Sequence, residues 1–250
     1  MANFAKYVEY LEKWLAEQLD YYQADGFVIG ISGGVDSAVT AHLLARKYKE
    51  KTIGVILPCS SNPQDMKDAQ LVIDNTGIES HCIDLTKTHS ILMEEVQAFL
   101  PDTERRRVVD GNTRARLRMT TLYAVAQSKN YIVVGTDNAA EWYTGYFTKF
   151  GDGGVDIVPI IHLNKQEVYE MARYFEVPAP ILAKAPSAGL WEDQTDEGEI
   201  GTTYEMIAKH LAGEKIPDKD YETIMYWHNR SHHKRELASA PGKKLNDFEI

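Results

Sequence analysis

Cysteine is scarce in this sequence, and the little there is lacks the spacing that metal sites need. The 250 residues include two cysteines, Cys59 and Cys82, and neither belongs to a CxxC pair or stands at zinc-ligand spacing from another cysteine or a histidine. Neither has the setting of a nucleophile activated by an adjacent base. We therefore expect both to be reduced thiols of a cytoplasmic protein.

Long apolar runs and an excess of positive charge are missing as well. No apolar run approaches the length of a membrane-spanning helix. Residues 1–23 are charged and carry apolar side chains at helical spacing, which predicts an amphipathic helix and not a signal peptide. The formal net charge of −10 argues against nucleic-acid binding. We therefore expect small-molecule partners, neither nucleic acid nor membrane, and a local basic cluster for any anionic substrate.

The two most familiar phosphate-binding loops are also absent. No Gly-Lys-Ser/Thr occurs, and the glycine-rich loop at 30–37 reads G-I-S-G-G-V-D-S, not G-x-G-x-x-G. This loop lies between an apolar run and a helical pattern, so it aims backbone N–H groups and the helix dipole at one point, which suits phosphate oxygens. Asp36 among phosphates suggests a bridging cation such as magnesium. The alternative is a plain turn whose Ser and Asp cap the helix.

Short β-branched runs alternate with helical patterns along the chain. The strand-like runs, buried in character, are 27–31, 52–57, 78–83 and 131–134, and the helical segments fall near 37–48, 63–75, 86–98, 113–128 and 164–175. This alternation predicts an α/β fold with a doubly wound parallel sheet flanked by helices. Ligands of such sheets bind at the carboxyl ends of strands, so we expect the site in loops 32–37, 58–63 and 135–141.

A second acidic loop, G-T-D-N-A-A-E at 135–141, follows the fourth strand-like run. Its position mirrors that of the first loop, so Glu141 can share a cation with Asp36. Thr-Asp before a helix is also an ordinary helix cap, which remains the alternative.

Basic side chains cluster at several places along the chain, most densely as arginines at 105–107, 114, 116 and 118. Helical spacing places Arg114 and Arg118 on one face and Arg116 on another. Three interpretations stay open: a solvated face, bidentate binding of an anionic ligand, and RNA binding, which the acidity of the chain disfavours. Lys149, Lys165 and the basic cluster at 231–235 are, taken singly, equally compatible with plain surface residues.

Taken together, these segments resemble the ammonia-dependent NAD synthetases of the N-type ATP pyrophosphatase superfamily. The resemblance runs from the N-terminal helix to about Ala240. Its carriers are the two loops above together with N-T-R-A-R-L-R-M at 112–119, Y-F-T-K-F-G-D-G-G-V-D at 146–156, L-N-K at 163–165, P-S-A-G-L-W at 186–191, D-E-G-E-I-G at 196–201 and S-H-H-K-R at 231–235. Eight segments in the family's order make the resemblance specific.

The resemblance also implies roles for individual residues. It implies that ATP is bound by Gly30, Ile31, Ser32, Gly33, Gly34, Val35, Asp36, Ser37, Thr136, Lys165 and Ser187. At 187 the family usually has threonine, and serine keeps the hydroxyl. The residues implied for deamido-NAD are Arg116, Lys149, Asp156, His233 and Lys234. Asp36 and Glu141 would hold Mg²⁺, and with Lys165 they are the expected catalytic residues.

The activity implied by the resemblance is that of a ligase in NAD biosynthesis. The nicotinate carboxylate of deamido-NAD attacks the α-phosphate of ATP and releases pyrophosphate, and ammonia then displaces AMP to give NAD. The family further implies an adenine nucleotide alpha hydrolase-like, Rossmann-like fold and a homodimer. We expect 1–250 to form one domain without a glutaminase domain, with a frayed tail at 241–250.

Other classes of protein remain open on the sequence. One is a different N-type ATP pyrophosphatase, although tRNA-thiolating enzymes tend to carry cysteine pairs and a GMP synthetase-like enzyme would lack the segments at 149–156 and 231–235. Another is a non-catalytic nucleotide-binding module. Such a module would be expected to lose a carboxylate, whereas Asp36 and Glu141 are both present.

Overall fold

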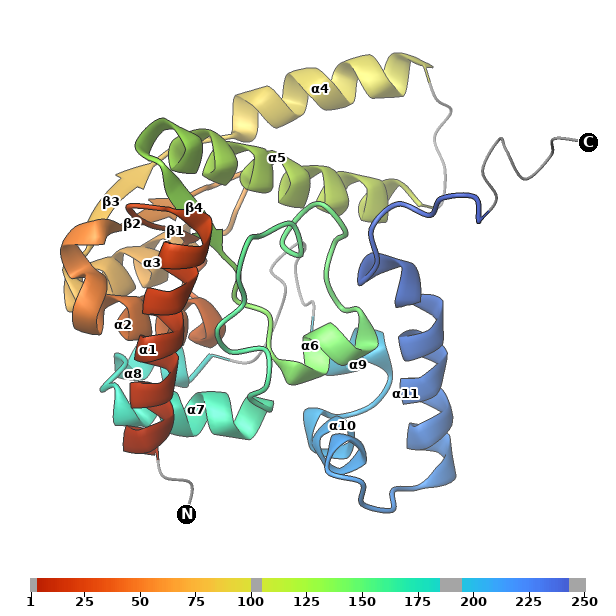
Figure 1. Cartoon of the computed structure of the whole chain (residues 1–250). Coiled ribbons are helices and arrows are strands. Elements are labelled where there is room, and N and C mark those ends of the chain that lie inside the picture. Colours follow the sequence, from red (N-terminus) through yellow and green to blue (C-terminus); the bar gives the residue numbers. More distant parts are fainter. Residues whose placement is uncertain (1–3, 100–104, 185–194, 243–250) are drawn as a thin grey trace, which may run out of the picture.

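A parallel sheet of four strands forms the centre of the computed structural model, which describes residues 4–99, 105–184 and 195–242 (Figure 1). The strands are β1 (Gly26–Gly30), β2 (Thr52–Ile56), β3 (Glu79–Cys82) and β4 (Tyr131–Val134), in the order β3-β2-β1-β4. Phe27 of β1 is in register with Thr52 on one side and Ile132 on the other. The chain therefore reverses its direction of winding between β1 and β4, where ligands of such sheets bind.

Alternating side chains of the central strands pack into two separate hydrophobic cores, one on each face of the sheet. Phe27 and Ile29 face one core, and Val28 faces the other. The first core packs against apolar residues of the helices α1 (Phe4–Tyr22), α2 (Val35–Tyr48), α3 (Pro63–Thr76), α7 (Lys165–Tyr174) and α8 (Ala179–Leu182). Because strands buried on both faces read as continuous apolar runs, this arrangement explains the sequence of β1.

The opposite face of the sheet is covered by the long helix α5 (Arg106–Lys129). The helix α4 (Thr86–Phe99) lies along α5 on its outer side (Figure 1). A third apolar cluster joins α6 (Ala139–Thr144), α9 (Asp196–Ile200), α10 (Tyr204–Leu211) and α11 (Asp218–Arg230) beside the sheet. Short 3₁₀ turns lie at Lys49–Lys51 and His232–Lys234. The predicted α/β fold with a doubly wound parallel sheet is confirmed.

Two details of the sequence prediction were wrong. The strand-like run at 78–83 was expected to be buried, but β3 lies at the edge of the sheet and Glu79 and Cys82 are exposed. The helix expected from 113 begins at Arg106, because its first turns carry arginines that gave no apolar periodicity. Of the expected frayed tail, Pro241 and Gly242 have no regular structure and the rest lies outside the described residues.

Both cysteines are free thiols, Cys59 being buried and Cys82 exposed. Within residues 4–99, 105–184 and 195–242, no helix has the length and apolar character needed to cross a bilayer.

Candidate active site

A cleft of about 1320 Å³ opens at the carboxyl ends of β1, β2 and β4. It is lined by both acidic loops, by Lys165 at the start of α7 and by Asp196 of α9. The strand order places the loop after β1 beside the loop after β4, so residues 30–37 and 135–141 meet although a hundred positions separate them. The loops in which we expected the site therefore line one cleft, and the size of this cleft suits a small-molecule substrate.

The loop after β1 needs glycine for its conformation. Gly33 has a φ of +79°, and a Cβ there would lie 2.7 Å from Cβ of Asp68 and 2.8 Å from the carbonyl oxygen of Asp65. The Ser32 and Ser37 hydroxyls lie 3.0 Å apart. Gly34 is the N-cap of α2 and has no side chain with which to cap the helix.

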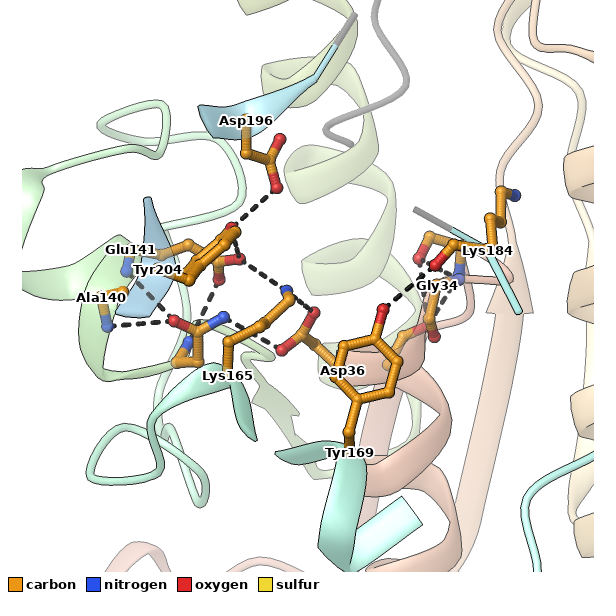
Figure 2. Close-up of polar contacts among 12 residues, drawn as sticks. Gly34, Asp36, Ala140, Glu141, Lys165, Tyr169, Lys184, Asp196 and Tyr204 are labelled. Atoms are coloured by element: carbon orange, nitrogen blue, oxygen red, sulfur yellow. Dashed lines mark hydrogen bonds and ion pairs between the residues drawn. The ribbon is translucent and has the colours of Figure 1, made fainter. Parts of the chain in front are cut away.

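Lys165 joins the two carboxylates that the sequence singled out (Figure 2). Its side chain is buried, and Nζ lies 2.6 Å from Oδ2 of Asp36 and 3.3 Å from Oε1 of Glu141. Burial alone would lower the pKa of the lysine, but Asp36 and Glu141 outweigh it and raise the pKa. Lys165 is therefore a fixed cation between two acidic groups.

Glu141 is also contacted by Tyr204 of α10. Burial raises its pKa to about 7, against the opposing effect of Lys165. The hydroxyl of Tyr204 donates to Oδ2 of Asp196 at 2.7 Å and lies 3.3 Å from Oε1 of Glu141. Burial and these carboxylates raise the pKa of Tyr204, so the phenol stays protonated. Tyr204 was not singled out in the sequence, and Asp196 was named only as the start of the segment at 196–201, with no role of its own.

Asn138 connects the two acidic loops and was also missed. It is fully buried, and its Nδ2 donates to Oδ1 of Asp36 at 3.0 Å. Its Oδ1 accepts from the backbone N–H groups of Ala140 and Glu141, while its own N–H donates to Oε2 of Glu141. The loop does cap a helix, but the capping side chain is Asn138 and not the expected Thr136 or Asp137, and Asn138 also bonds to Asp36 of the site. An Asn three residues before a Glu is the capping-box signal that would have found it.

Removing the Asn138 side chain is expected to impair catalysis beyond the loss of a helix cap. Asn138→Ala loses the cap of α6, which costs about 1–2 kcal/mol of unfolding free energy. It also frees Asp36, so we expect kcat to fall by about tenfold or more, since misplacement of a catalytic group is costly. Denaturant unfolding and steady-state kinetics measure the two effects. The control Thr203→Ala removes the cap of α10 and should lower stability alone; an equal kcat in both variants would contradict the positioning role of Asn138.

Lys184 forms a second cationic bridge at the rim of the cleft. Its Nζ contacts Oδ1 of Asp65 and Oδ2 of Asp68 from α3. Tyr169 donates to its carbonyl oxygen (Figure 2). The residue expected to contact ATP through its hydroxyl, Ser187, lies outside the described residues. Thr136, the other expected hydroxyl contact, lines the cleft.

The residues implied for deamido-NAD are only partly brought together. Lys234 lines the cleft, but its Nζ donates to the carbonyl oxygens of Gly145 and Phe147. The guanidinium of Arg116 lies 3.4 Å from the Lys149 carbonyl oxygen, and Lys149 in turn donates to the carbonyl of His233. These three form a group that does not line the cleft.

Asp156 already accepts hydrogen bonds from groups of the protein itself. Its carboxylate accepts from the backbone N–H of Val133 at 2.7 Å and from the Tyr123 hydroxyl at 3.0 Å, while Tyr22 donates to its carbonyl oxygen. It does not line the cleft either. In this conformation Asp156 therefore anchors the segment between α6 and α7 to β4 and α5.

The arginines on α5 have different environments. Arg118 lines the cleft and donates to the Leu57 carbonyl oxygen and to Oγ of Ser61. Arg114 pairs with Asp110 at 2.7 Å, and Arg116 is exposed. Arg114 and Arg118 are thus held by groups of the protein itself, which is a structural role outside the three interpretations considered for the basic run.

Comparison with known proteins identifies the family of this fold and cleft. The family model described as NAD synthase matches residues 7–238. The chain belongs to the NAD synthase family. An NH(3)-dependent NAD(+) synthetase from Alkaliphilus oremlandii is 50% identical over 244 residues, covering 96% of this chain and 98% of the relative.

Solved structures of related proteins agree with this NAD synthase fold. An NMN synthetase from Francisella tularensis superimposes with a TM-score of 0.92 at 47% identity, covering 97% of this chain and all of that one. The NAD+ synthetase from Burkholderia pseudomallei gives a TM-score of 0.76 at 30% identity, covering 95% of this chain and 92% of that one. The family match favours NAD synthesis over the GMP synthetase-like and tRNA-thiolating alternatives.

Proposed function

We propose that this member of the NAD synthase family amidates the nicotinate carboxylate of deamido-NAD with ammonia, at the expense of ATP, and releases NAD, AMP and pyrophosphate. The observation that carries the proposal is the buried Lys165 between Asp36 and Glu141, at the point where the sheet reverses. A fixed cation beside a glycine-rich loop at a helix N-terminus is suited to neutralising the phosphates of ATP. We place this activity in the cytoplasm, with no nucleic-acid or membrane partner.

Two steps follow from the residues of the cleft. In the first, a nicotinate oxygen attacks the α-phosphorus and the bond to the β-phosphate breaks, while backbone N–H groups of residues 30–37 neutralise phosphate charge. An ammonium group has three donors, and within the described chain Asp36 and Glu141 accept two of those of Lys165, which leaves one for a phosphate oxygen. In the second, ammonia attacks the acyl carbon and AMP leaves. The protein contributes position and charge, not a covalent nucleophile.

The acidic pair fits a magnesium ion as an additional partner. Asp36 and Glu141 converge on one point and offer the carboxylate oxygens that Mg²⁺ prefers. The described ranges contain no group of three or more His, Cys, Asp or Glu that could hold a metal, so the protein would supply two carboxylates and leave the remaining positions to water and phosphate. Bound there, the ion would neutralise charge on the transferring phosphate.

The products of ATP cleavage test this proposal. Incubation with ATP, magnesium, ammonium and deamido-NAD should yield NAD, AMP and pyrophosphate in equal amounts, and omission of deamido-NAD should stop AMP formation. Chromatography of the nucleotides gives the answer. Formation of ADP and phosphate would refute the proposal.

A second candidate substrate is the mononucleotide, nicotinate mononucleotide. The relative with a TM-score of 0.92 is named an NMN synthetase, and in this chain Asp156 is engaged by Val133 and Tyr123 and is not offered to a dinucleotide. Steady-state kinetics with the two acids under identical conditions separate the candidates. A larger kcat/KM for deamido-NAD supports the dinucleotide, and a larger value for the mononucleotide supports the second candidate.

We further propose that the nitrogen comes from free ammonia and that the chain acts as one domain. The described cores account for a pyrophosphatase fold, and Cys59 does not fit an activated nucleophile, since burial raises the pKa of its thiol, while Cys82 is exposed at the edge of the sheet. The purified protein should therefore form amide with ammonium and none with glutamine. Product formed from glutamine in the absence of ammonium would contradict this.

We also propose that the protein is a homodimer that associates through α5 and its neighbour α4. These helices expose Ile91, Leu92, Phe99, Val108 and Val109. An apolar surface of this kind is unusual for a monomer, and closed two-fold dimers are the commonest assembly. Light scattering should give twice 28.3 kDa at micromolar concentration. The variant Ile91→Lys/Val108→Lys should give 28.3 kDa with unchanged stability of the monomer; a wild-type mass of 28.3 kDa would exclude the dimer.

A further inference from the structure

The turn that follows α11 rests on the C-terminal end of α6, the short helix that carries Glu141. The two helices lie side by side (Figure 1). At the end of α6, a Cβ on Gly145 would overlap the side chain of Ser231, the first residue after α11. Ser231 is 3% exposed, so this contact is buried. The residues after Ser231 therefore continue along the end of a helix that belongs to the site.

One guanidinium group in this turn ties the ends of both helices together. Nη1 of Arg235 donates to the carbonyl oxygens of Trp142 at 3.1 Å and Tyr143 at 3.2 Å, near the end of α6. Its Nη2 donates to the carbonyl oxygen of His228, in the last turn of α11, at 2.7 Å. The last carbonyl groups of a helix lack the N–H groups of a following turn, and a basic side chain satisfies them. The planar fork of arginine can serve two helices at once.

The residue before Arg235 reaches the cleft from the same turn. Lys234 lines the cleft, and its Nζ donates to the carbonyl oxygens of Gly145 and Phe147. Two of its three ammonium donors are thereby used within the described chain, which leaves one for an anionic group of a substrate. The family resemblance implies contacts with deamido-NAD for His233 and Lys234, but it gives Arg235 no role.

The backbone links the positions of Lys234 and Arg235 closely. Residues His232–Lys234 form a 3₁₀ turn, in which the N–H of Lys234 donates to the carbonyl oxygen of Ser231 at 2.8 Å. The N–H of Arg235 donates to the carbonyl oxygen of His232 at 3.0 Å. Without the guanidinium, the carbonyl groups of both helix ends need water as their partner, because an unpaired buried acceptor is costly. Water entering there would separate the turn from α6 and carry Lys234 with it.

We propose that Arg235 is a positioning residue that holds Lys234 at the wall of the cleft for the nicotinate substrate. This inference rests on the proposed function. Lys234 lines the cleft and Arg235 does not, so the guanidinium acts through its neighbour and not on the substrate itself. The ATP side keeps anchors of its own, because Glu141 is bonded to the N–H of Asn138 and to Lys165. Loss of Arg235 should therefore impair the use of the nicotinate substrate much more than the use of ATP.

Kinetics with each substrate varied in turn test the assignment. For Arg235→Ala we expect the KM for the nicotinate substrate to rise by about tenfold or more, and the KM for ATP to change by less than about threefold. Methylguanidinium can fill the space that the side chain leaves and should restore much of the loss. Methylammonium at the same concentration should restore none of it, because it lacks the planar fork of donors. A side chain that only stabilised the fold would show neither the difference between substrates nor the rescue.

Two further variants complete the experiment. Arg235→Lys keeps the charge and should fold even if Arg235→Ala does not, yet its KM for the nicotinate substrate should stay raised, since one ammonium lacks the fork that spans both helix ends. The control Arg230→Ala removes an exposed arginine at the end of α11, one that bonds to the hydroxyl of Tyr226, and should leave both KM values unchanged.

The outcomes separate this inference from the proposed function. If Arg235→Ala and Arg235→Lys raise both KM values equally, or neither, or if methylguanidinium restores nothing, Arg235 does not position Lys234. If the wild-type protein amidates neither deamido-NAD nor the mononucleotide, the proposed function itself is wrong and the role of Arg235 falls with it.

Discussion

Replacing Lys165 by methionine is expected to abolish most of the turnover and to destabilise the protein at the same time. Methionine keeps the length and the packing but leaves Asp36 and Glu141 facing each other without their shared cation. Removal of one partner from a buried ion pair costs about 3–5 kcal/mol of unfolding free energy. Loss of a cation aimed at the reacting phosphate lowers kcat by about 10²-fold or more.

The loss of stability should depend on pH in a defined direction. Burial raises the pKa of Glu141 from its ordinary 4.5 to about 7, and Lys165 opposes this rise. Without the lysine the pKa of Glu141 rises further. At pH 8 the folded variant must therefore either bury the Glu141 charge without a partner or protonate it, whereas the unfolded chain exposes that charge to water. Near pH 5 the folded chain keeps Glu141 neutral. The deficit in unfolding free energy should therefore be largest at pH 8 and shrink toward pH 5.

Urea unfolding at the two pH values and steady-state kinetics measure these effects. Lys165→Met/Glu141→Gln should recover much of the stability at pH 8, because one of the facing charges is gone, but none of the turnover. Lys209→Met is the matched control, since Lys209 pairs with Glu205 at an exposed position, where ion pairs add little to stability. A change in Lys165→Met no larger than in Lys209→Met would contradict the buried ion pair.

The features that the sequence predicted well are those written in local patterns. The strands β1, β2 and β4 are continuous β-branched runs, and their positions were predicted to within a residue or so. The loop at 30–37 was recognised from its glycines, which lie between a strand pattern and a helix pattern. The exposure of β3 was mistaken because its place at the edge of the sheet follows from strand order, which no local pattern contains.

The central contacts of the site could not be found in the same way. Asp36 and Glu141 were named from the two acidic loops and Lys165 through the family resemblance, but their direct contact depends on the sheet placing β4 next to β1. Asn138 and Tyr204 complete this network through single hydrogen bonds. From the sequence alone, Asn138 has the pattern of a helix cap and Tyr204 that of a core aromatic residue, and only the folded structure shows their contacts with the site.

Substitutions at the two adjacent glycines of the loop after β1 should affect different properties, stability at Gly33 and the KM for ATP at Gly34. Gly33→Ala forces a side chain onto a φ of +79° and brings its Cβ within 2.9 Å of the Ala69 nitrogen and closer still to Asp65 and Asp68. Strain and overpacking together are expected to cost about 2–5 kcal/mol of unfolding free energy. Activity falls because the loop and the start of α3 must separate.

Gly34→Ala should leave the fold intact and affect ATP alone. Gly34 has a φ of −87°, and its nearest neighbour to an added Cβ is the flexible Oγ of Ser32 at 3.3 Å. We expect an unfolding free energy within about 1 kcal/mol of wild type, since no strained backbone is involved. The methyl group lies at the wall of the cleft, where phosphate oxygens approach the backbone, so the KM for ATP should rise by about tenfold or more while the KM for ammonium is unchanged. Urea unfolding and ATP titration of the two variants decide the matter: a Gly34→Ala protein with wild-type KM for ATP would show that the phosphates do not approach this loop.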